Sequence, residues 1–189
     1  MPLDVPCNAK EISLEIMTRM RLLAEAKKFL RYLVGKRSEL EDLHTKDILM
    51  AKVILDIHSN YSRKEVISVP LFSLHKIHPI DRENALETTR RRMEVLELNK
   101  KALIEKGSLT CELLAHYLPS VSWIKVVEKR PGSFLAFEGN GRLAAMQKVF
   151  SVEDGLCVEV KRYQFRNPKK IIQSLDKIRA LNGLLSRDA

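Results

Sequence analysis

An apolar segment that runs through two glycines into a helix-forming segment constrains the fold more than any other part of this sequence. Residues 134–137 read Phe-Leu-Ala-Phe, and residues 142–150 are rich in Leu, Ala, Met and Gln. Between them lie Gly139 and Gly141, which favour a tight turn because glycine adopts backbone conformations that other residues avoid. The sequence therefore predicts a strand that leads through a short turn directly into a helix.

The first turn of that helix is a candidate anion site. The first backbone N–H groups of a helix lack an intrahelical acceptor, and the helix dipole adds partial positive charge there. Together with the Arg142 side chain, these donors would bind a phosphate or similar anion through Gly139, Asn140, Gly141 and Arg142. The structural alternatives are that the glycines and Asn140 serve only a turn with positive φ, and that Arg142 binds a carboxylate of its own domain.

Glu138, at the end of the predicted strand, is a candidate general base or metal ligand. A carboxylate beside an anion site would be placed to accept a proton from a substrate. A surface carboxylate at a strand end explains this residue equally well. The stretch is not a Walker P-loop, because no Lys-Ser or Lys-Thr pair follows Gly141, and it lacks the third glycine of the dinucleotide fingerprint.

Strands and helices are expected on both sides of this turn, which predicts an α+β fold. Runs of β-branched or alternating apolar residues predict strands, and apolar residues spaced by three, four or seven positions predict helices. The long helix is expected to turn Leu86, Met93, Leu96 and Leu103 inward. The expected strands cover 66–72, 123–129, 133–138 and 156–165, the expected helices cover 83–106, 110–117 and 167–183, and a loop is expected at 73–81.

The N-terminal part of the chain reads as a helical extension. An apolar stripe from Ile12 to Val34 predicts a long helix, and a second helix begins at Ser38 or Thr45 and ends at Asn60. Two helices joined by a short linker suggest a hairpin, which would pack on the main domain or form the seam of a homodimer. The predicted domains are therefore an N-terminal helical extension at 1–62 and a main domain at 63–189.

The chain is basic, with 33 Lys and Arg against 24 Asp and Glu and a formal net charge of +9. A basic balance favours anionic partners such as nucleotides or nucleic acid, although Lys and Arg also serve simply to solubilise surface helices. The run Arg90, Arg91 and Arg92 is explained most simply as a solvated helix face. As candidate nucleic-acid contacts we nevertheless take Arg90, Arg91, Arg92, Lys169 and Lys170.

Cysteine usage and hydropathy indicate an intracellular protein, cytoplasmic or nuclear. The three cysteines are far apart in the sequence and predict neither a disulfide framework nor a zinc site. No apolar run is long enough to span a bilayer, and the N-terminus lacks the apolar core and cleavage site of a secretory signal. We therefore expect no membrane partner and no metal site built by the protein alone.

The segment from Glu138 to Arg142, together with its neighbours, resembles the signature of the ParB/sulfiredoxin-like superfamily. Members carry a strand, a Gly-x-x-Arg turn and an Ala-containing helix, matched here by Gly139, Arg142 and Ala145. The order of flanking elements is similar over residues 66–165, with an early strand, a polar loop, a long helix, a hairpin that delivers the turn, and a late strand. The resemblance implies a small mixed sheet with packed helices.

The resemblance implies a phosphate-binding frame and leaves the reaction open. Superfamily members include partitioning proteins that bind CTP and DNA, nucleases, a free serine kinase and sulfiredoxin. Asn140 stands where sulfiredoxin has its nucleophilic cysteine, so reduction of sulfinic acids is not expected. Glu138 matches the acidic residue of the kinase-like members, whose two histidines are missing here.

The loop after the first strand faces the phosphate site in this superfamily. Its polar side chains in the present chain are His75, Lys76, His78 and Asp81, of which a lone loop histidine is more often a surface residue than a ligand. Asp81 and Glu83 would hold Mg²⁺ on a bound nucleotide such as ATP or CTP, because Mg²⁺ prefers oxygen ligands.

Three functions remain open from the sequence alone. The first is nucleotide or phosphate binding at 138–142, with phosphoryl transfer or nucleotide hydrolysis as the reaction if there is one, and Glu138 and Asp81 as catalytic candidates. The second is a DNA- or RNA-binding protein without catalysis, which uses its basic helices. The third is a catalytically inactive interaction module that works through its N-terminal hairpin.

Overall fold

The computed structural model describes residues 45–120 and 122–184 of the chain. The chain divides into two compact units, Met1–His44 and Thr45–Ala189, and the described residues all belong to the second. The predicted helix at 12–34, and a homodimer seam formed by it, lie outside the described residues. Helix α2, Thr45–Asn60, is the second helix predicted from the sequence, and it is part of the second unit.

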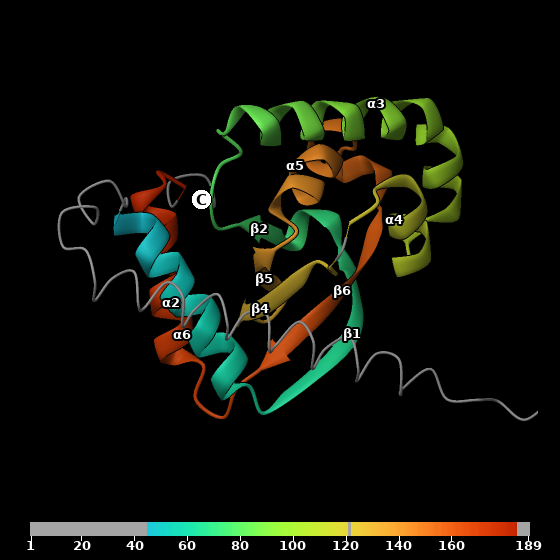
Figure 1. Ribbon diagram of the computed structural model, residues 1–189. Helices are drawn as coiled ribbons and strands as arrows, with labels where there is room; N and C mark the ends of the chain where they lie inside the picture. The colour runs from blue at the N-terminus through green and yellow to red at the C-terminus, as the bar shows by residue number, and fades with distance from the viewer. Residues whose placement is uncertain (1–44, 121, 185–189) are drawn as a thin grey trace, which may run out of the picture. The chain divides into compact units, whose positions relative to one another are not determined.

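A mixed six-stranded sheet with helices on both faces forms this unit (Figure 1), which confirms the mixed α and β composition predicted from the sequence. The strand order is β1-β6-β4-β5-β2, and β3 also pairs with β6. Neighbours β4 and β5 are antiparallel, whereas β2 runs parallel to β5. The strands are β1 (Arg63–Pro70), β2 (Leu74–Lys76), β3 (Ser108–Leu109), β4 (Lys125–Arg130), β5 (Ser133–Glu138) and β6 (Cys157–Gln164). The remaining helices are α3 (Glu83–Lys106), α4 (Cys111–Tyr117), α5 (Asn140–Val149) and α6 (Lys169–Leu181), with 3₁₀ turns at Leu71–Ser73 and Val152–Asp154.

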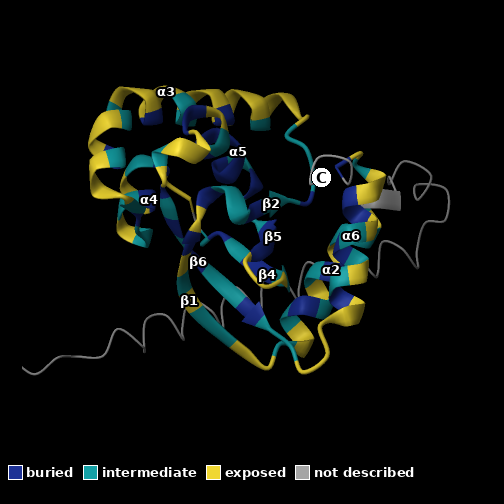
Figure 2. Cartoon of the chain, turned by 180° about the vertical axis from the view of Figure 1, so that it is seen from behind, coloured by how far each residue is buried: buried dark blue, intermediate teal, exposed yellow. Residues whose placement is uncertain are grey.

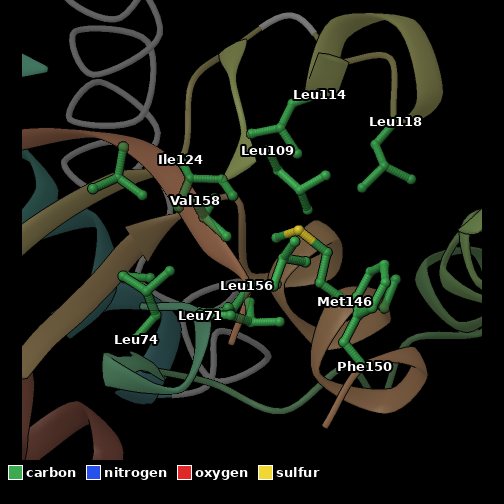
Figure 3. Close-up of a cluster of buried hydrophobic side chains, with 14 of the residues drawn as sticks. Leu71, Leu74, Leu109, Leu114, Leu118, Ile124, Met146, Phe150, Leu156 and Val158 are labelled. Carbon is green, nitrogen blue, oxygen red and sulfur yellow. The ribbon is translucent and has the colours of Figure 1, made fainter. Parts of the chain in front are cut away.

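Each face of the sheet buries its own hydrophobic cluster, because side chains alternate along the central strand β5. Phe134 and Ala136 face α3, α4 and α5, and Figure 3 shows part of the cluster that they join. Leu135 and Phe137 face the opposite way, toward α2 and α6. All of β5 except Glu138 is buried, as is most of α5 (Figure 2). The strand-to-helix segment is therefore the central element of this unit.

Helices α2 and α6 pack side by side on one face of the sheet (Figure 1). Val53 and Ile57 of α2 are buried in the same cluster as Leu175 of α6. An ion pair of 2.8 Å between Lys129 Nζ on β4 and Asp176 on α6 fastens this layer to the sheet. None of the described helices is both long and apolar enough to cross a membrane.

The long helix matches its predicted bounds, whereas the short strands were not predicted. Helix α3 ends at Gly107, whose φ of 67° is left-handed. Residues 74–76 form β2 and not a loop, because they pair with β5, and three residues are too few to show an alternating pattern in the sequence. The prediction that Leu86 faces inward is wrong, since the buried stripe of α3 begins at Thr89.

Candidate anion-binding site

The strand-to-helix turn lies at the edge of the sheet where β5 and its parallel neighbour β2 both end. Lys76, the last residue of β2, is paired with Ala136 of β5. Two residues further on, β5 ends at Glu138, and α5 begins at Asn140. The carboxyl ends of parallel strands are a common place for ligands in sheets with helical crossovers, and here they bring the loop after β2 next to the turn.

The two glycines of the turn are required for different reasons. Gly139 has a left-handed φ of 84°, and a Cβ atom there would lie 2.8 Å from Cγ1 of Ile124. Positive φ is the wrong explanation for Gly141, which does not have it. A Cβ atom at that position would lie 3.0 Å from Nη1 of Arg92. Gly141 therefore leaves room for a guanidinium against the first turn of α5.

The first turn of α5 presents backbone donors. Its first hydrogen bond runs from Leu143 N to Gly139 O at 3.0 Å, and within the described residues no side chain caps the helix. The N–H groups of Asn140, Gly141 and Arg142 therefore have no intrahelical acceptor. With the helix dipole, this arrangement attracts an anion.

Arg142 is a buried guanidinium that has no carboxylate partner among the described residues. Its side chain is 4% exposed, Nη2 donates to the carbonyl of Ser122, and Nε is buried without an acceptor in the part of the chain that the structure describes. Burial is the main cause that lowers the pKa of Arg142, and the charge of Arg92 lowers it further, against weaker opposite effects of Cys111 and Glu138. Among the described residues, Arg142 thus binds a carbonyl and does not form the ion pair with a carboxylate that the sequence left as an alternative.

Arg92 differs from the two arginines that precede it in its burial and in its neighbours. Arg90 and Arg91 are exposed, and Arg91 forms an ion pair of 2.8 Å with Glu87 on the same helix. Arg92 is half-buried, its burial lowers its pKa, and its Nη1 lies against Gly141. The sequence suggested Arg92 only as one of a run of three. The helical spacing could have distinguished Arg92, since it lies three residues after buried Thr89 and four before buried Leu96, on the same face of α3.

The peptide group that joins Lys76 to Ile77 is held at both ends beside the turn. Its N–H, on Ile77, donates to Oδ1 of Asn140 at 3.0 Å, and its carbonyl, on Lys76, accepts from Nε of Arg179 at 3.1 Å. Asn140 is 3% exposed, so its side chain belongs to the fold and its backbone N–H is the group left for a ligand. In the same loop, His78 Nδ1 lies 2.9 Å from the carbonyl of Pro79.

Of the candidate catalytic carboxylates, Glu138 directly precedes the turn, whereas Asp81 and Glu83 lie at the start of α3. Glu138 forms an ion pair of 2.7 Å with Nζ of Lys125 across the β4–β5 hairpin. Asp81 and Glu83 are exposed where the chain enters α3. Among residues 45–120 and 122–184, no three His, Cys, Asp or Glu side chains group to hold a metal ion. The role of Asp81 and Glu83 as ligands of a nucleotide-bound Mg²⁺ therefore stays a prediction.

The remaining basic candidates lie elsewhere in the fold. Lys169 and Lys170 are exposed at the start of α6, on the face of the sheet opposite to α3. They do not form one surface with Arg90 and Arg91.

Comparisons of the whole chain with protein-family models, with curated proteins and with solved structures find no match. The geometry of the turn is therefore what bears on function.

Proposed function

We propose that this protein binds a phosphate-bearing ligand, with a nucleotide as the first candidate, at the first turn of α5. The observation that carries the proposal is the buried guanidinium of Arg142, which has an unpaired Nε and no carboxylate partner among the described residues. Burying a charge without a counter-charge costs several kcal/mol, roughly, even after the protein relaxes. A bound anion would supply both the counter-charge and the missing acceptor.

The donors around this turn suit the oxygens of a phosphate. Backbone N–H groups of a helix start and guanidinium N–H groups are the usual partners of phosphate oxygens in proteins. A nucleotide is favoured over a nucleic acid because the basic residues proposed to track a nucleic-acid backbone lie on opposite faces of the sheet. The interaction-module alternative depends largely on residues outside those described.

Binding is proposed without an assigned reaction. The turn would position a phosphate and stabilise its charge, which is most of what phosphoryl transfer requires of a protein. A base is also needed, and Glu138 is engaged with Lys125. Phosphoryl transfer and nucleotide hydrolysis therefore remain secondary proposals.

Calorimetry with ATP, CTP, ADP and inorganic phosphate, each with and without Mg²⁺, tests the proposal. We expect at least one ligand to bind more tightly than millimolar, and Arg142→Gln to weaken it about tenfold or more, because a charged hydrogen bond is lost. The matched control is Arg91→Gln, which removes an exposed arginine of α3. The proposal fails if no ligand binds more tightly than millimolar, or if a folded Arg142→Gln variant binds like the wild type.

A further inference from the structure

We propose that Arg92 makes the α5 site selective for a terminal, doubly charged phosphate over a phosphodiester. This inference rests on the proposed function, because it concerns the same site. It assigns to one arginine of α3 the choice between two classes of phosphate ligand.

The position of Arg92 is the first support. Its Nη1 lies 3.0 Å from the point that a Cβ of residue 141 would occupy, so the guanidinium lies against the backbone of the first turn. Thr89 Oγ1 lies 3.7 Å from the same point and is held by a hydrogen bond of 2.7 Å to the carbonyl of Ala85. A side chain at position 141 would therefore displace this guanidinium.

The second support is the charge of the pair, which no ion pair balances within the described residues. Arg92 and Arg142 are close enough for the charge of one to lower the pKa of the other, yet neither forms an ion pair with a carboxylate in the described parts of the chain. Arginine stays protonated at neutral pH in either position. Arg92 Nη1 thus lies beside Gly141, and the buried guanidinium of Arg142, on the same turn, donates to the carbonyl of Ser122. The charge of Glu138 opposes that of Arg92 at Arg142 only weakly.

Charge balance then selects the ligand. A phosphate monoester carries about −1.5 to −2 charges at pH 7 and has three oxygens without a substituent. A phosphodiester carries a single negative charge and has only two such oxygens. A monoester would offer one oxygen each to the α5 backbone, to Arg142 and to Arg92, whereas a diester has one negative charge fewer and one unsubstituted oxygen fewer for the same donors.

Matched ligands test the selectivity. Adenosine and cytidine 5′-monophosphates are compared by calorimetry at pH 7.5 with their methyl esters, in which the terminal phosphate has become a diester. In the full chain we expect the monoester to bind about tenfold more tightly or better, because one charged hydrogen bond distinguishes the two ligands. Arg92→Gln should reduce this ratio to near one, and Arg92→Lys should retain part of it.

Two controls make the outcomes decisive. Arg91→Gln changes the neighbouring exposed arginine and should keep the wild-type ratio. Thermal melting of each variant separates loss of selectivity from loss of the fold. If Arg92→Gln does not fold, the ratio measured with Arg92→Lys is compared with that of the wild type and should be lower. The inference is overturned if the methyl esters bind as tightly as the monoesters, or if Arg92→Gln keeps the preference. If no phosphate compound binds at all, the proposed function fails together with this inference.

Discussion

At the scale of single residues, the turn depends on groups whose identity follows from space and charge. Gly139 combines a left-handed backbone with a close approach to Ile124, and Gly141 makes room for Arg92. The sequence alone predicted that the glycines form a turn. It did not distinguish their two roles, because the atoms that require them, in Ile124 and Arg92, belong to other elements of the fold.

Gly139→Ala should destabilise the protein by about 2–4 kcal/mol, since it adds the strain of positive φ to a steric overlap with Ile124. Urea denaturation at 25 °C measures the loss. The matched control is Gly132→Ala, where φ is 75° but no atom of the described residues lies within 4 Å of the added Cβ. Only the backbone strain should remain there, about 1 kcal/mol. Equal losses of unfolding free energy in both variants would show that the contact with Ile124 is not what restricts position 139 to glycine.

At the scale of elements, the regular helices and the hairpin could be predicted from local pattern, but the assembly of the site could not. Helix α3 and the strands on either side of the turn at 130–133 follow from periodicity and turn residues. Strand β2 becomes a strand only through its pairing with β5. The approach of Arg92 to Gly141 depends on how α3 packs on α5, which no local signal specifies.

Asn140→Asp should weaken phosphate binding about tenfold, because the new carboxylate would compete for the positive charges at the start of α5. Stability should change by about 1 kcal/mol or less in either direction, because the helix dipole favours a carboxylate there whereas its burial disfavours one. The Ile77 N–H keeps an acceptor. Asn140→Ala should instead lose about 1–3 kcal/mol by leaving that N–H unpaired. Calorimetry and urea denaturation give both quantities. An Asn140→Asp variant that binds phosphate like the wild type would count against an anion at this turn.

At the largest scale that the structure describes, the sheet separates its helices into two groups. Helices α3, α4 and α5 cover the face next to the candidate site, whereas α2 and α6 cover the other face (Figure 1). The sequence placed α2 in an extension at 1–62, because its apolar stripe does not reveal its partner. In the structure, that stripe contributes to the cluster that also buries α6.

A fragment that begins at residue 45 should therefore fold, and a fragment that begins at residue 63 should not match its stability. The shorter fragment loses buried Val53 and Ile57, each worth about 1.5–3 kcal/mol, and exposes the apolar stripe of α6. Urea denaturation and light scattering of fragments 45–189 and 63–189 compare them. Equal stability of both fragments would mean that α2 is dispensable for this unit.

The doubly held peptide between Lys76 and Ile77 has a consequence for communication across the sheet. A peptide group is planar and rigid, so the hydrogen bond that it makes with Asn140 cannot reorient without disturbing the one that it makes with Arg179. Linkage between two such contacts is reciprocal. Any effect of α6 on the start of α5 through this peptide group should therefore equal the effect of α5 on the end of α6. A substitution of Arg179 should therefore be felt at the first turn of α5, although Arg179 lies on α6.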